Sequence, residues 1–331
     1  MSELRLNLIT GNWVVIATDR AKRPDDFVRD VEKHTSLPYE PKCPFCAGNE
    51  SMTPHDIQRF PAEGPWQLRV VPNKFAALSL DTEPERHNMG RLHRMGGFGS
   101  HEVVIETPQH HQSLTDYDEA HVSNLLRIYR DRFRALYEIS AIEHVIVFKN
   151  HGKAAGTSLA HPHSQIIATP VVPMQVRERM HEYMRYFDHT GECLMCSTLA
   201  DELADGRRIM IESEYFVSFV PYAALSPFHL WVFPRHHQGS FAQINESQLQ
   251  DLARHLQKLL RTLKAAVGDP SYNFIIRSNS PESCHREYFH WYLSIVPRVA
   301  KAAGFELGSG MFINASVPED SAAFLREFLV Q

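Results

Sequence analysis

Long apolar stretches are absent from this chain of 331 residues, since no run approaches the roughly 18 residues that a membrane-spanning helix needs. The N-terminus lacks the basic-then-apolar pattern of a secretory signal. Lysine and arginine form no dense stripe with interleaved aromatic residues, and the net charge is −5, which argues against nucleic acid as the main partner. We therefore expect a cytoplasmic protein with no membrane partner.

A dispersed framework of cysteines for disulfides is also missing. The chain has five cysteines, and four of them form two C-x-x-C pairs, Cys43/Cys46 and Cys193/Cys196. In a reducing compartment such pairs are typical of metal ligands or redox centres. The fifth, Cys284, has no partner in the pattern and is interpreted as structural. The composition is otherwise ordinary for a globular chain, with 43% hydrophobic and 22% charged residues.

The two halves of the chain resemble each other in the order of their motifs. Residues 71–78 resemble 220–225, and the alternating runs 101–114 and 229–241 both end at paired histidines. Periodic apolar residues then predict helices over 116–139 and 245–267, followed by strands over 145–148 and 273–276. The sequence therefore predicts a duplicated α+β unit, with domains at 1–170 and 171–331, each an antiparallel-rich sheet with packed helices.

Each half supplies a C-x-x-C pair, a histidine after the middle strand and a histidine on the last strand. Two thiolates and two imidazoles form a tetrahedral zinc set with no open position, so we expect two structural zinc ions per chain. His111 is an alternative to His110, and His236 to His237; exposed or internally satisfied histidines beside incidental cysteine pairs are the other alternative. The expected ligands are Cys43, Cys46, His110 and His161 at one site, and Cys193, Cys196, His237 and His290 at the other.

The motif His161-Pro162-His163-Ser164-Gln165 carries the candidate chemistry. Residues two apart on a strand share a face, so His161 can bind a metal while His163 stays free as a nucleophile. The second half has Tyr292 at the corresponding place, which favours catalysis in the first half alone. A packed strand residue is the plain alternative for His163.

Polar and small residues before this motif suit a phosphate. Asn150 and Gln165 can hydrogen-bond a phosphoryl oxygen, and Lys149 or Lys153 can offset its charge. The stretch with Gly152, Gly156, Thr157 and Ser158 offers backbone N–H groups and hydroxyls to anionic oxygens.

These residues resemble the galactose-1-phosphate uridylyltransferase family of the histidine-triad superfamily, from residues 7–13 and 20–24 through Cys43-Pro44-Phe45-Cys46 and 73–78 to HPHSQ and HWYLSIVPR. The resemblance implies two histidine-triad-like halves, a homodimer and a ping-pong reaction in which His163 attacks the α-phosphorus of a nucleotide sugar. It also implies that Asn73 lies in the nucleotide-contacting stretch and that Asn150, Ser158 and Gln165 hold phosphate oxygens. Arg20 and Arg23 resemble arginines that reach a neighbouring subunit's phosphates; a solvated basic turn is the alternative.

Two departures bear on the substrate. The chain has Asn73-Lys74-Phe75 where uridylyltransferases carry Asn-Asp-Phe, and residues 304–314 lack their Tyr-Glu pair and look more like the ADP-glucose phosphorylases. The first hypothesis is nucleotidyl transfer between UDP-glucose and a hexose 1-phosphate such as galactose 1-phosphate. The alternative is adenylyl transfer from ADP-glucose to phosphate, and the remote one is a non-catalytic zinc-stabilised nucleotide-binding module.

Overall fold

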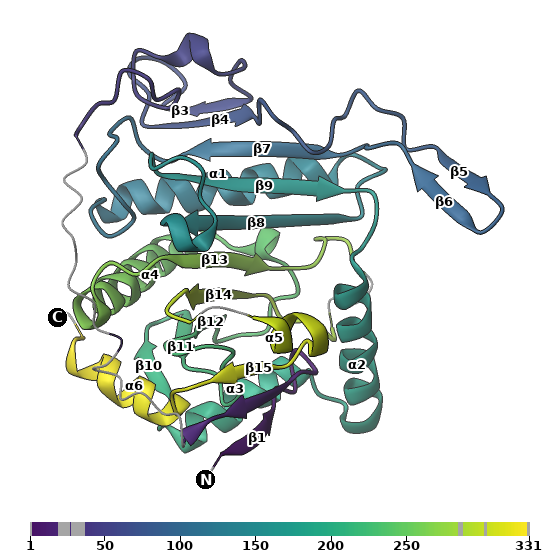
Figure 1. The fold of residues 1–331 in the computed structure, drawn as a ribbon, viewed down its shortest axis with the longest axis vertical. Helices are drawn as coiled ribbons and strands as arrows, with labels where there is room; N and C mark the ends of the chain where they lie inside the picture. Colours follow the sequence, from purple (N-terminus) through teal and green to yellow (C-terminus); the bar gives the residue numbers. More distant parts are fainter. Residues whose placement is uncertain (1, 19–26, 28–36, 284–286, 301–302, 330–331) are drawn as a thin grey trace.

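Ten strands form one antiparallel sheet in the part of the chain that the computed structural model describes, which is residues 2–18, 27, 37–283, 287–300 and 303–329 (Figure 1). From one edge to the other the strands are β10 (Ile209–Glu212), β11 (Phe216–Phe219), β12 (Leu230–Pro234), β14 (Tyr292–Pro297), β13 (Tyr272–Arg277), β8 (His144–His151), β9 (His163–Thr169), β7 (Ser100–Ile105), β4 (Leu68–Pro72) and β3 (Gln58–Phe60). The predicted α+β class with antiparallel sheets is confirmed.

The two halves meet at the middle of this sheet, where β8 pairs with β13. Their register runs from Tyr272 opposite His151 to Ile276 opposite Val147. Each half therefore covers the other's exposed strand edge, which would otherwise be open to pairing with another chain. The expected division at 170/171 falls between the end of β9 and the next helix, α2 (Met174–Thr190), and stays a prediction.

Two long helices lie on one face of the sheet and pack against each other (Figure 1). The first is α1 (Glu119–Tyr137), which begins where the Asp118 carboxylate accepts from the His121 backbone N–H. The second is α4 (Glu246–Val267), which begins with a reciprocal cap between Asn245 and Gln248. Both predicted helices and both predicted strands are present, because a strong apolar period and local caps fix them.

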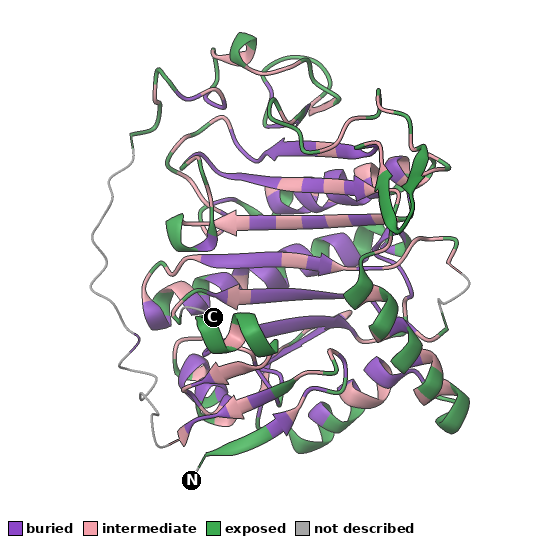
Figure 2. Cartoon of the chain, turned by 45° about the vertical axis from the view of Figure 1, so that its right-hand side comes forward, coloured by how far each residue is buried: buried purple, intermediate pink, exposed green. Residues whose placement is uncertain are grey.

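The remaining elements lie around the main sheet. A small sheet pairs both ends of the chain, and Figure 2 shows that the hairpin of β5 and β6 is exposed whereas the central strands are largely buried. None of the described helices is both long and apolar enough to cross a bilayer. These elements are β1 (Glu3–Leu6), β2 (Trp13–Ile16), β15 (Phe312–Asn314), β5 (Arg86–Met89), β6 (Leu92–Met95), α3 (Leu194–Asp205), α5 (Gly304–Ser309), α6 (Pro318–Glu327) and the short 3₁₀ helices η3 (Glu50–Met52), η4 (Lys153–Ala155) and η5 (Phe241–Gln243).

Candidate functional site

The candidate nucleophile is the first residue of β9. The register between β8 and β9 places Phe148 opposite Gln165, so continuing it by two residues places Asn150 opposite His163. Directly opposed residues of an antiparallel pair share a face. Asn150, His163 and Gln165 therefore lie on one face of the sheet, on two adjacent strands.

A backbone hydrogen bond fixes the tautomer of His163. Its Nδ1 lies 2.8 Å from the carbonyl oxygen of His161, and because a carbonyl can only accept, Nδ1 carries the proton. The lone pair of Nε2 is left available. Burial lowers the pKa of His163, although the same carbonyl opposes this effect, so the ring is neutral near pH 7. A neutral imidazole with one committed nitrogen is suited to nucleophilic attack.

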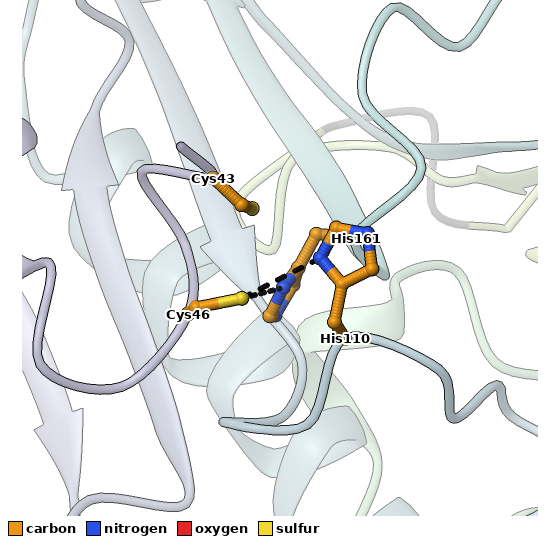
Figure 3. A group of neighbouring side chains, drawn as sticks. All are labelled: Cys43, Cys46, His110 and His161. Atoms are coloured by element: carbon orange, nitrogen blue, oxygen red, sulfur yellow. Dashed lines mark hydrogen bonds between the residues drawn. The ribbon is translucent and has the colours of Figure 1, made fainter. Parts of the chain in front are cut away.

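Four of the expected metal ligands come together beside His163. Cys46 Sγ lies 3.4 Å from Nδ1 of His110 and 3.6 Å from Nδ1 of His161, and the ligand atoms of Cys43, Cys46, His110 and His161 are all within 4.8 Å of one another (Figure 3). Sulfur and nitrogen ligands of a tetrahedral zinc ion are roughly 3.5 Å apart. His161 Nε2 donates to the Thr107 carbonyl at 2.7 Å, which leaves its Nδ1 free for a metal. These residues fit zinc.

In the second group of expected ligands, three of the four residues come together. The ligand atoms of Cys193, Cys196 and His237 lie within 4.8 Å of one another, and His290 Nδ1 is 3.4 Å from Cys196 Sγ. His290 Nε2 is buried and makes no hydrogen bond within the described residues. Burial lowers the pKa of His290 to about 3, and the nearby Pro234 carbonyl partly opposes this effect. The second cluster is also a candidate zinc site.

The Asn150 side chain is oriented from the second half of the chain. Nδ2 of Asn273 donates to Oδ1 of Asn150 at 2.7 Å, and the Arg298 guanidinium donates to Oδ1 of Asn273. With its oxygen occupied, Asn150 has its own amide N–H groups left to donate to an anion. No local sequence pattern marks Asn273 or Arg298 as site residues, because only the pairing of β8 with β13 brings them here.

Gln165 is oriented from the neighbouring strand β7. His101 Nδ1 accepts from the Ala77 backbone N–H at 3.3 Å, so its proton is on Nε2, which lies 2.7 Å from Oε1 of Gln165. Gln165 therefore also keeps its N–H groups for an anion. Nδ2 of Asn73 lies 3.1 Å from the same Nε2, which places Asn73 beside this group. His101 is a further residue of the site that no local sequence pattern marks.

A buried polar network lies on the opposite face of strands β8 and β9. Lys149 Nζ is 2.7 Å from Oε2 of Glu106 and also donates to the His163 carbonyl at 3.3 Å. Tyr129 Oη is 2.6 Å from Ser164 Oγ and donates to Glu106. The interpretation of Lys149 as a partner for the phosphate charge is wrong, because its ammonium is buried against Glu106. Successive residues on a strand point to opposite faces, so Lys149 already points away from the face that carries Asn150.

The loop between β8 and β9 holds the small residues. Gly156 follows η4 in the left-handed region at φ 90°, and both Gly156 and Ser158 are exposed. Thr157 is engaged locally, since its hydroxyl donates to the Leu159 carbonyl. Arg20, Arg23 and Cys284 lie outside the described residues.

Family models match residues 1–173 and 179–269 of the chain, and known proteins match nearly all of it. The N-terminal domain of galactose-1-phosphate uridyl transferase matches residues 1–173, and its C-terminal domain matches residues 179–269. An ADP-glucose phosphorylase of Arabidopsis thaliana is 36% identical over 98% of this chain and 92% of its own length. A galactose-1-phosphate uridylyltransferase of Thermotoga maritima is 26% identical over 100% of both chains.

Solved structures of proteins with the same names also match this chain. The crystal structure of an ADP-glucose phosphorylase from Arabidopsis thaliana with bound ADP-glucose matches with a TM-score of 0.84 and 34% identity, over 99% of this chain and 98% of the other. A uridylyltransferase structure matches with a TM-score of 0.76 and 26% identity, over 99% and 98%.

Proposed function

Because this chain belongs to the galactose-1-phosphate uridyl transferase family of nucleotidyl-transferring enzymes, we propose that His163 carries the nucleotidyl group as a covalent intermediate. The observation that carries the proposal is the hydrogen bond from His163 Nδ1 to the His161 carbonyl, which directs the Nε2 lone pair away from the backbone. Asn150 and Gln165 lie on the same face with amide donors available for phosphoryl oxygens.

The reaction has two displacement steps. In the first, His163 Nε2 forms a bond to the α-phosphorus of a nucleotide sugar while the bond from that phosphorus to the bridging oxygen breaks, releasing the sugar 1-phosphate. In the second, an oxygen of a phosphate acceptor attacks the same phosphorus, the phosphorus–nitrogen bond breaks and neutral His163 is regained. The amide donors offset the charge that develops on the phosphoryl oxygens.

ADP-glucose with inorganic phosphate as acceptor is the substrate pair that the relatives favour. The relative named ADP-glucose phosphorylase is 36% identical to this chain over the aligned residues, against 26% for the Thermotoga maritima uridylyltransferase. Residues 304–314, which include α5 and β15, also lack the Tyr-Glu pair of the uridylyltransferases. Uridylyl transfer between UDP-glucose and galactose 1-phosphate, the first hypothesis from the sequence, is the second candidate, since full-length relatives carry that name.

Two structural zinc ions and a homodimer complete the proposal. The first cluster supports the metal assignment, because its spacing and its hydrogen-bonded His161 fit a closed tetrahedral site that holds the HPHSQ segment in place. The homodimer rests on the family resemblance, in which Arg20 and Arg23 resemble arginines that reach a neighbouring subunit's phosphates.

Trapping the intermediate tests the proposal. The enzyme is incubated with ADP-glucose or UDP-glucose without acceptor, and mass spectrometry identifies the nucleotide and the modified peptide. We expect an AMP adduct on His163, its discharge by inorganic phosphate, and no adduct in His163→Ala. The exposed His189→Ala serves as the matched control. A UMP adduct discharged only by galactose 1-phosphate would favour the second candidate, and no adduct with either sugar would contradict both.

A further inference from the structure

The second half of the sheet repeats the catalytic strand pair with different side chains. Arg277 lies directly opposite Tyr292 on β13 and β14, just as Asn150 lies opposite His163 on β8 and β9. The pairing of β8 with β13 agrees with a correspondence between Asn150 and Arg277. It places Asn273 opposite Asn150 and, continued by one residue, Ile146 opposite Arg277. Arg277 thus replaces the amide, and Tyr292 replaces the nucleophile.

The hydrogen bonds of a neighbouring histidine are also repeated in the second half. His229 Nδ1 accepts from the Leu225 backbone N–H at 3.3 Å, and its Nε2 lies 2.9 Å from Ser294 Oγ. His101 makes the same two contacts with Ala77 and Gln165, at 3.3 and 2.7 Å. The second half therefore keeps the scaffold of a phosphate pocket although it has lost the imidazole nucleophile.

A small cavity, which we call the Arg277 cavity, lies at this repeated position. Its volume is about 30 Å³, above the 10–15 Å³ that one water requires. A wider groove of about 540 Å³ adjoins it and shares Asn279 and His144 with it, so a solute can enter. The polar side chains that line the Arg277 cavity are Arg277, Arg179, His144, Ser278, Asn279, Tyr183 and Tyr292.

The charge of the Arg277 cavity is uncompensated. Within the described residues Arg277 makes no hydrogen bond or ion pair, and no carboxylate lines the cavity; Glu143 and Glu282 line only the outer groove. Burial is the main cause of a lowered pKa of Arg277, and the like charge of Arg179 adds to it. Burial and Arg277 together lower the pKa of His144 to about 4, so this ring is neutral. The half-buried guanidinium of Arg277 has lost part of its hydration without gaining a counterion among the described residues, and a bound anion offsets that cost.

We propose that the Arg277 cavity binds a phosphate-type oxyanion and holds it without transferring it. A guanidinium presents two parallel donors to such an anion, and the Tyr292 hydroxyl and the Asn279 amide add neutral donors. Tyr292 offers no ring nitrogen for a phosphorus–nitrogen bond, so the anion stays unreacted. The small volume restricts the ligand to free phosphate or to the phosphoryl end of an ester that extends into the outer groove.

Binding of inorganic phosphate to the full-length protein tests this assignment. Thermal unfolding is followed in wild type, Arg277→Met and the matched control Arg185→Met, whose side chain is 68% exposed on α2. At a phosphate concentration about tenfold above the Kd, we expect the Tm to rise by about 2 °C through the Arg277 cavity. Arg277→Met should lose this rise, and without phosphate its Tm should equal or exceed that of wild type, because a half-buried charge without a counterion has been removed.

Calorimetric titration distinguishes phosphate binding at the catalytic pocket from phosphate binding at the Arg277 cavity. Wild type should show two classes of phosphate site, of which Arg277→Met removes one and Gln165→Ala weakens the other. Repeating the titration with glucose 1-phosphate distinguishes free phosphate from a phosphate ester. Equal Tm responses of wild type and Arg277→Met, or the same response to chloride at matched ionic strength, would overturn the assignment.

Discussion

His101 holds the Gln165 side chain in one orientation, because its Nε2 proton is directed at Oε1 of Gln165 over 2.7 Å. The Ala77 backbone N–H fixes that proton, since it occupies the other ring nitrogen. In the proposed reaction Gln165 therefore presents N–H donors rather than its oxygen to the phosphoryl group. We accordingly expect His101 to act through Gln165 as a positioning residue.

Replacing His101 by alanine should lower kcat/KM by about 10- to 100-fold, because Gln165 would then rotate freely. The His163 adduct should still form, only more slowly. Steady-state kinetics and single-turnover adduct formation provide the measurement, with metal content as a check on the fold. His87→Ala, on the exposed hairpin, should behave as wild type. Unchanged kinetics in His101→Ala would refute the positioning role.

The buried pair of Lys149 and Glu106 should show strong coupling in stability. Lys149→Met leaves the Glu106 carboxylate, which is fully buried, without its cation, at a cost of about 3–5 kcal/mol. Glu106→Gln in the same chain should restore much of this stability. Urea unfolding of the two single variants and the double variant measures the coupling. Additive effects would show that the two groups do not interact energetically.

Acid stability should depend on His255 of α4. Burial lowers its pKa to about 4, below the 6.5 of an unfolded chain, so only the unfolded state gains a proton between these values. The stability that the neutral ring supports is complete above pH 6.5 and is lost as the pH falls toward 4. Between pH 7 and 5 wild type should lose about 2 kcal/mol more than His255→Gln. Thermal unfolding of both proteins at the two pH values measures the difference, and parallel losses would contradict the prediction.

The two metal clusters should differ in their rate of metal loss. Cys196 and His237 line an open groove of about 640 Å³, whereas three of the four residues of the first cluster are buried. A chelator should therefore remove about one zinc per chain quickly and one slowly. Cys196→Ser should abolish the fast phase, and Cys43→Ser should impair folding. Release of both ions in one phase would show that exposure does not control the rate.

Local sequence patterns were sufficient to predict much of this fold. The caps at Asp118 and at Asn245 with Gln248 lie within one turn of their helices, and the alternation around His163 fixes which residues share its face. The C-x-x-C pairs and the HPHSQ motif likewise pointed to two clusters. His110 and His237, rather than their neighbours His111 and His236, are the histidines that lie beside the cysteines.

The rest depends on contacts between distant segments. Nothing near Asn150 in the sequence indicates that Asn273, 123 positions away, will orient it. His101 reaches Gln165 only because β7 pairs with β9 in one register, with Val103 opposite Gln165. Arg277 resembles an ordinary strand residue until its opposite neighbour is known to be Tyr292. Sheet register over such separations is set by packing and loop closure, which a single sequence does not display.

The chain of contacts from Arg298 through Asn273 to Asn150 crosses the seam between β13 and β8. An excised N-terminal half would keep His163 and its neighbouring cysteines, but the Asn150 amide would be free to turn its oxygen toward the incoming anion. The N-terminal half therefore depends on the C-terminal half for the orientation of a single carboxamide.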